Sequence, residues 1–129
     1  MNKTQSNQFS VLFTTARNAG LLAGEKAIPA PMVVCEHSNP LDDSSPVVRR
    51  YAPILDGCCG FSWVSVKGNT AFGRWAKKAG LARPGYPNGL HFWCHDFNQS
   101  LERKEAYSAA FAAVLNANGI TAYSESRMD

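Results

Sequence analysis

The side chains best suited to chemistry in this sequence are its cysteines and histidines. The chain contains 4 cysteines and 3 histidines, and both residue types are common zinc ligands. His91, Cys94 and His95 form the tightest group, but no Cys-x-x-Cys pair is present and no cysteine pair precedes a histidine pair at zinc-finger spacing. In a strand, Cys94 would share one face with Phe92, while His91 and His95 would share the other. We therefore predict neither a metal site nor a bound cofactor.

Local signatures of common enzyme classes do not occur in the sequence. It contains no GxSxG, no P-loop and no GxGxxG, the cues of serine hydrolases, NTPases and dinucleotide-binding enzymes. Cys59 could act as a nucleophile beside His91 or His95, with Asp96 orienting the imidazole, only if the fold assembles them. We predict a binding protein without catalytic residues. The alternative is a small metal- or thiol-dependent enzyme that uses His91, Cys94 and His95.

The strongest functional signal is a concentration of positive charge. Residues 57–95 contain no Asp or Glu, and Arg74, Lys77 and Lys78 follow an i, i+3, i+4 spacing that puts them on one face of a helix. Such a surface suits phosphate groups or an acidic protein; the alternative is an ordinary solvated helix face. Exposed aromatic side chains nearby would add stacking surface for bases, the candidates being Tyr86, Trp93 and Phe97. The predicted binding surface comprises Lys67, Arg74, Lys77, Lys78, Arg83 and Tyr86.

The elements that position this surface begin with a helix. Apolar residues recur at helical spacing from Phe9 to Lys26, with Ser6 or Asn7 as the cap. Gly20 and Gly24 within it would let another element pack closely. A short strand is predicted at 32–35, a polar surface loop at 38–46, and an extended segment at 47–55 that Pro53 assigns to a sheet edge.

The second half alternates strands and helices. The pattern predicts a strand ending near Val66, followed by a short helix that Asn69 or Thr70 caps and Gly80 ends. A turn-rich loop at 83–89 leads to a predicted strand at 90–97. The last predicted elements are a helix that begins after Ser100 and closes at Asn118–Gly119, a strand at 120–124 and a frayed tail. We therefore predict an α+β fold, a two-layer sandwich in which a short mixed β-sheet carries helices mainly on one face. The predicted core is Phe61, Trp63, Phe72, Trp75, Phe92, Phe111, Val114 and Leu115.

Length and composition fit one globular domain over residues 1–129. The chain is 45% apolar and 18% charged, with a net charge of +3, values ordinary for a folded domain. No apolar run approaches the ~20 residues that span a bilayer, and Met1–Gly20 shows no signal-peptide pattern. We expect a cytoplasmic protein that does not act at a membrane, with its cysteines present as free thiols.

Three segments resemble a family of small accessory proteins encoded by tailed bacteriophages. They are Pro31–Val34, Gly57–Val64 and Gly119–Asp129, and the similarity extends over most of the chain, including Gln99–Ala106. The resemblance transfers no activity and no functional residue; it implies a protein made in the cytoplasm of an infected bacterium, where such proteins often bind host factors, defence complexes or nucleic acid.

Charge and resemblance together give a functional prediction. We expect an accessory protein that binds nucleic acid, or a host or defence complex that handles nucleic acid, in an anti-defence or host-takeover role. A second alternative is a virion or assembly component, in which the loop at 38–46 and exposed strand edges mediate self-association. The sequence leaves a homo-oligomer open.

Overall fold

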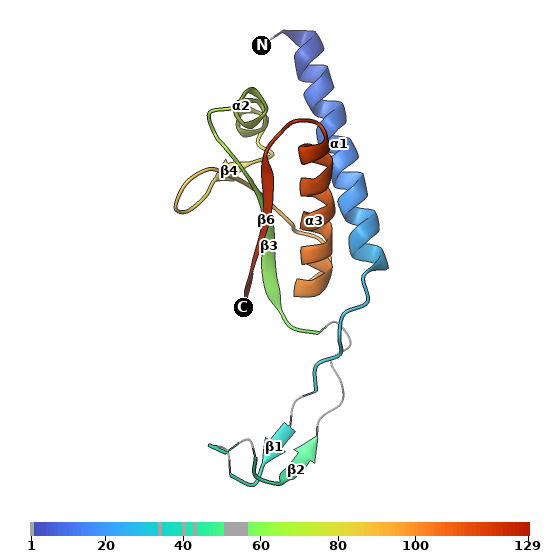
Figure 1. The fold of residues 1–129 in the computed structure, drawn as a ribbon, viewed down its shortest axis with the longest axis vertical. Coiled ribbons are helices and arrows are strands. Elements are labelled where there is room, and N and C mark those ends of the chain that lie inside the picture. The colour runs from blue at the N-terminus through green and yellow to red at the C-terminus, as the bar shows by residue number, and fades with distance from the viewer. Residues whose placement is uncertain (1, 34, 40, 43, 51–56) are drawn as a thin grey trace.

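A computed structural model describes residues 2–33, 35–39, 41–42, 44–50 and 57–129. The elements run in the order α1 (Lys3–Lys26), β1 (Cys35–His37), β2 (Val47–Arg50), β3 (Gly60–Val66), α2 (Ala71–Lys78), β4 (Arg83–Pro84), β5 (Leu90–Trp93), α3 (Leu101–Ala117) and β6 (Ala122–Met128). Figure 1 shows α1 and α3 side by side along one face of a sheet. The predicted α+β class is confirmed.

The main sheet has 4 strands in the order β4-β5-β3-β6, and each neighbouring pair is antiparallel. The expectation of a mixed sheet is therefore wrong for the described strands, because α2 connects β3 with β4 and α3 connects β5 with β6, and neither pair is adjacent in the sheet. From β3 onward the chain runs β-α-β-β-α-β with β3 and β5 at the centre, which is the connectivity of the split β-α-β motif. Strands β1 and β2 pair as a separate hairpin that extends away from this body (Figure 1).

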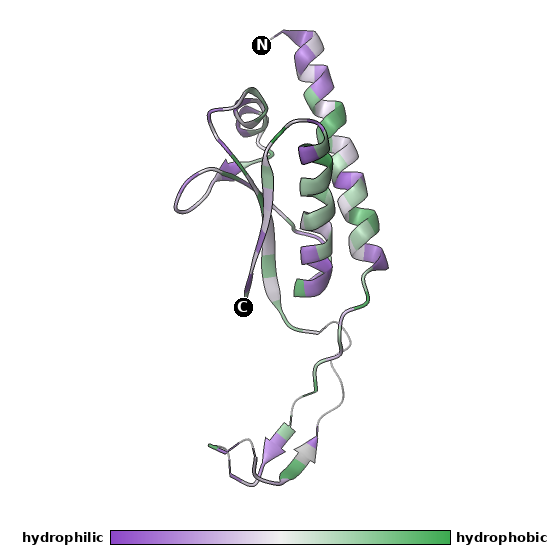
Figure 2. Ribbon diagram, in the orientation of Figure 1, coloured by the Kyte–Doolittle hydropathy of each residue, from purple (hydrophilic) through white to green (hydrophobic). Residues whose placement is uncertain are grey.

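The core lies between the sheet and the pair α1 and α3. The Phe13 ring of α1 and the Phe111 ring of α3 approach the Phe92 ring of β5, with centroids 6.0 Å and 5.4 Å away. Phe72 from α2 closes one end of this cluster, 5.8 Å from Phe92. The middle of α3 is correspondingly hydrophobic in Figure 2. Of the predicted core, the buried members are Phe72, Phe92, Phe111 and Leu115, with Trp75 and Val114 packed against them.

The remaining two predicted core residues, Phe61 and Trp63, lie on the opposite face of the sheet. The buried residues of β3 are Gly60, Ser62, Val64 and Val66. Helix α3 packs closely over small residues here: a Cβ on Gly60 would lie 2.8 Å from Leu101 Cδ1. A large ring on this side of β3 would force the helix away, so the two rings turn outward.

Close approach also fixes the pairing of α1 with α3. A Cβ on Gly20 would lie 2.8 Å from the Tyr107 ring, so the glycine provides the space that the sequence predicts. Helix α1 begins earlier than predicted, at Lys3, because the side chain of Asn2 accepts a hydrogen bond from the backbone N–H of Gln5. Ser6 lies inside the helix and does not cap it.

Several predicted strand boundaries are shifted. Strand β1 is centred on Glu36 instead of Val33, and Pro53 lies outside the described residues. Strand β5 stops at Trp93, and the chain turns at Phe97 and Asn98, which have positive φ, within the range predicted as strand or directly after it. The predicted fraying tail is instead part of β6, which pairs with β3 as far as Met128. Because β6 is an exposed edge strand with polar residues on both faces, its sequence shows no alternation of apolar and polar residues. Among the described residues, no helix is long and apolar enough to cross a membrane.

Candidate nucleic-acid interface

An aromatic cluster occupies the face of the sheet that points away from α3. It is formed by Phe61 and Trp63 of β3 together with His91 and Trp93 of β5, and Trp63 pairs in register with Trp93. The Trp63 and Trp93 ring centroids are 4.8 Å apart, and the His91 ring stacks 5.5 Å from Trp63 at 23° between planes. Phe61, Trp63 and Trp93 are each half-buried, so part of each ring is open to solvent. We call these four residues the aromatic face.

Strand β6 supplies charged partners to the aromatic face. The Trp63 indole Nε1–H donates a 2.6 Å hydrogen bond to Glu125 Oε2, which fixes the plane of that ring. The Arg127 guanidinium lies over the Phe61 ring, 5.2 Å from its centroid. Arg127 is exposed, so its charge stands beside the aromatic surface and favours approach of an anion.

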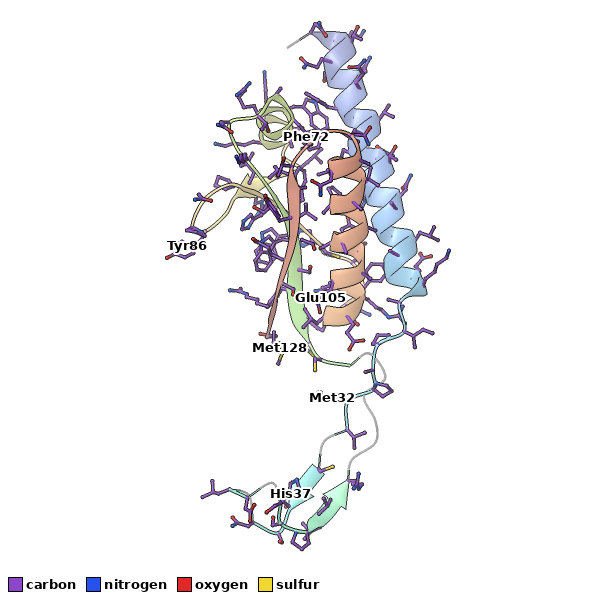
Figure 3. All side chains as sticks on the ribbon, in the orientation of Figure 1. Met32, His37, Phe72, Tyr86, Glu105 and Met128 are labelled. Carbon is purple, nitrogen blue, oxygen red and sulfur yellow. The ribbon has the colours of Figure 1, made fainter. Side chains whose placement is uncertain are left out.

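The loop between β4 and β5 forms the border of the aromatic face on the other side. Arg83 pairs in register with His91 and is exposed. Gly85 lies directly against the imidazole of His91, where any side chain would collide with the ring. Tyr86 stands at the tip of the loop with 93% of its surface exposed (Figure 3). Two of the six predicted binding residues, Arg83 and Tyr86, therefore lie beside this face.

The predicted helical stripe is solvent-exposed on α2. The Thr70 side chain caps the helix by accepting from the backbone N–H of Gly73 at 3.0 Å, and Phe72 turns toward the core. This leaves Arg74, Lys77 and Lys78 exposed on the opposite side. Among the described residues, no carboxylate forms an ion pair with Arg74, Lys77 or Lys78.

A groove of about 490 Å³ separates α2 from the start of α1. Lys3, Arg74 and Lys78 line it together with the Trp75 indole, whose Nε1–H donates to Ser6 Oγ at 3.2 Å. Lys67, which follows β3, is also exposed. All six predicted binding residues are thus at the surface. Four lie on α2 or just before it, and the other two, Arg83 and Tyr86, lie in β4 and in the loop that follows it.

Sequence reasoning missed most of the aromatic face. The sequence pattern assigns Phe61 and Trp63 to the core, and it offers His91 only as a metal ligand or as a catalytic base. Of the predicted stacking residues, Trp93 lies on the face, whereas Phe97 packs 6.3 Å from Tyr107 in the helical layer. The signal that could have found the face is the strand period of two, which puts Phe61 and Trp63 on one face of β3 and puts His91 and Trp93 on the face of β5 opposite to Phe92.

The cysteine and histidine candidates are separated by the sheet. Cys94 is buried with the core, and desolvation by burial raises the pKa of its thiol despite a hydrogen bond to the Asp96 carbonyl. His91 lies on the opposite face, and His95 is exposed. All 4 cysteines are free. Within the described part of the chain, no group of three or more His, Cys, Asp or Glu side chains could hold a metal ion.

Comparison of the chain with protein-family models, with curated proteins and with solved structures finds no match. The basis for a functional conclusion is therefore the geometry of the sheet and its surroundings.

Proposed function

We propose that this chain is a phage-type accessory protein that acts in the cytoplasm of an infected bacterium by binding single-stranded nucleic acid. The observation that carries the proposal is the aromatic face on the two central strands of the antiparallel sheet, bordered by Arg83 and Arg127. Unpaired bases stack on exposed aromatic rings irrespective of sequence, with about 1–3 kcal/mol for each base. Duplex DNA offers no such surface, because its bases are already stacked.

The arrangement of charge supports the same proposal. Arg83 and Arg127 lie on strands that flank the aromatic rings, at the positions where the phosphates of a strand crossing β3 and β5 would run. Lys67 and the stripe on α2 extend the positive surface beyond the end of β3. Each phosphate that these cations neutralise releases counterions, so binding would weaken steeply as salt rises.

The connectivity offers an analogy of fold. RNA-recognition modules also use a four-stranded sheet whose aromatic side chains stack two or three bases. Such a likeness alone does not assign a function, and the proposal depends on the residues of the aromatic face.

The test is binding of a fluorescently labelled single-stranded oligonucleotide, followed by anisotropy at several salt concentrations. We expect saturable binding that weakens with salt and exceeds binding of the matching duplex. The double change Lys77→Glu with Lys78→Glu should reduce affinity, because it reverses two stripe charges. The charge-matched control is Lys26→Glu with Arg50→Glu, at the end of α1 and in the β1–β2 hairpin, and it should retain the affinity of the parent.

The second candidate partner is a host or defence protein that itself binds nucleic acid. The stripe on α2 favours it, since an acidic protein surface would also be drawn to Arg74, Lys77 and Lys78. A pull-down from bacterial lysate, with and without nuclease, separates the two partners. The second proposal replaces the first if three results are obtained together. A host protein is captured even after nuclease treatment, the Lys77→Glu with Lys78→Glu variant no longer captures it, and the purified protein does not bind the oligonucleotide.

A further inference from the structure

A second cavity, of about 310 Å³, lies at the edge of β5 where the two-residue strand β4 begins. Residues from α1, the α2–β4 connection, β5 and α3 all line it. Phe92 lines it from the core side of the sheet, and His91 and Trp93 line it from the aromatic face. The cavity therefore opens beside the surface on which we place the strand.

The inner wall of this cavity is apolar and its rim is cationic. Phe13, Tyr107 and Phe111 contribute to the wall, and Arg17, Arg83 and His95 contribute polar nitrogen groups. No Asp or Glu is among the lining residues. An aromatic wall beside the guanidinium groups of Arg17 and Arg83 is a combination that suits a ligand with an aromatic ring and a phosphate.

Arg17 is held in position before any ligand arrives. Its Nη1 donates to the Tyr107 hydroxyl at 3.0 Å and to Asp96 Oδ2 at 3.3 Å. Burial alone would lower the pKa of the guanidinium, but Tyr107 and Asp96 outweigh burial and raise it. Both bonds use Nη1, whereas a guanidinium offers five N–H donors, so the same side chain can also donate to a phosphate.

We infer that this cavity binds one nucleotide of the strand, with the base against the apolar wall and the phosphate at Arg17, Arg83 and His95. The volume is at the lower end of the range for small-molecule sites, about 300–1,000 Å³, which fits a mononucleotide and not a larger cofactor. This inference rests on the proposed function: the strand on the aromatic face would deliver the nucleotide past Trp93. A nucleotide pocket would give an otherwise sequence-tolerant surface a preference for one base.

The test is calorimetric titration with adenosine 5′-monophosphate, adenosine and inorganic phosphate, repeated with the other three nucleoside monophosphates. We expect at least one monophosphate to bind saturably. The matching nucleoside and inorganic phosphate should each bind at least about tenfold more weakly, because the hydrogen bonds to the phosphate and the contacts of the base with the apolar wall contribute separately to the affinity. Arg83→Gln, which removes a rim charge, and Leu81→Trp, which fills the cavity, should each weaken the monophosphate by about tenfold. Arg50→Gln, at an exposed position in the β1–β2 hairpin outside both proposed surfaces, is the matched control and should leave the titration unchanged. Melting curves establish that each variant is folded.

The outcomes separate this inference from the proposed function. Failure of all four monophosphates to saturate, or saturation that a folded Leu81→Trp variant retains, overturns the nucleotide pocket. Inorganic phosphate binding as tightly as the monophosphate overturns it as well, since the base would then contribute nothing. If the single-stranded oligonucleotide still binds after any of these results, binding on the aromatic face is retained and only the nucleotide pocket is rejected. If neither the oligonucleotide nor a monophosphate binds, the proposed function is rejected as well.

Discussion

Trp93 lies at the centre of the aromatic face, so its removal is the sharpest perturbation of that surface. Its ring centroid is 4.8 Å from Trp63, 6.2 Å from Phe61 and 6.4 Å from His91. Trp93→Ala removes the stacking surface for one base, about 1–3 kcal/mol of binding free energy. The affinity for a single-stranded oligonucleotide should therefore fall by about 5- to 150-fold. Trp93→Phe keeps an aromatic ring at the same position and should recover most of the loss.

The assay is anisotropy with a labelled oligonucleotide, with urea unfolding of each variant in parallel. Trp93 is half-buried, so Trp93→Ala should remain folded, with a smaller loss of stability than a core truncation. Ile28→Ala changes an apolar side chain that is 91% exposed outside the site, and it should behave as the parent. A folded Trp93→Ala variant that binds as tightly as the parent would refute stacking on this face.

Other predictions concern the fold beneath the face. Phe111 is 1% exposed, and Phe111→Ala should lower the free energy of unfolding by about 3–5 kcal/mol, measured by urea unfolding. Gly20→Ala places a methyl group against the Tyr107 ring, and this overpacking should lower the free energy of unfolding by about 1–3 kcal/mol. An unchanged melting temperature would contradict this prediction. The Cys94 thiol has a raised pKa when folded, whereas an unfolded thiol titrates near about 8.5. Above that pH the unfolded state loses a proton that the folded state keeps, so stability should fall as pH rises from 8 to 10; Cys94→Ala should reduce this fall, and an identical slope in both proteins would contradict the assignment.

The second half of the fold was predictable where local signals agree. Helix α2 lies where its cap and its terminal glycine predict it, because the Thr70 hydroxyl caps its start and Gly80 adopts φ 77° after its end. Helix α3 likewise begins after Ser100, whose side chain accepts from the backbone N–H of Arg103. These capping residues and the helical residues that they contact lie within one helical turn of each other. The local sequence is therefore enough to predict where each helix begins or ends.

The orientation of β3 could not be predicted in the same way. Alternation identified the strand, but size and hydrophobicity assigned Phe61 and Trp63 to the inside. Packing against α3 determines which face of β3 is buried. On that face the Ser62 hydroxyl is hydrogen-bonded to Ser108 Oγ of α3 at 2.8 Å and donates to the Glu125 carbonyl of β6 at 2.8 Å. A buried serine is stable because partners 46 and 63 residues away satisfy it. Such partners are defined only by the tertiary structure.

The candidate site likewise has one part that the sequence predicts and one part that depends on the tertiary structure. The stripe of Arg74, Lys77 and Lys78 was predictable because it follows helical spacing within a single element. The aromatic face needed the register of β3 with β5 and of β3 with β6, which places Glu125 beside Trp63 and Arg127 beside Phe61. These pairings join residues far apart in sequence, so spacing along the chain cannot reveal them.

The most direct test of the central claim is photocrosslinking of the protein to a single-stranded oligonucleotide that carries photoreactive bases, followed by peptide mass spectrometry. Zero-length crosslinks form only where a base contacts a side chain, so the modified residues report the stacking surface itself. We predict crosslinks at Phe61, Trp63 and Trp93, which are lost when excess unlabelled oligonucleotide is added. Specific crosslinks confined to α1 or α2, with none on β3 or β5, would contradict binding on the aromatic face.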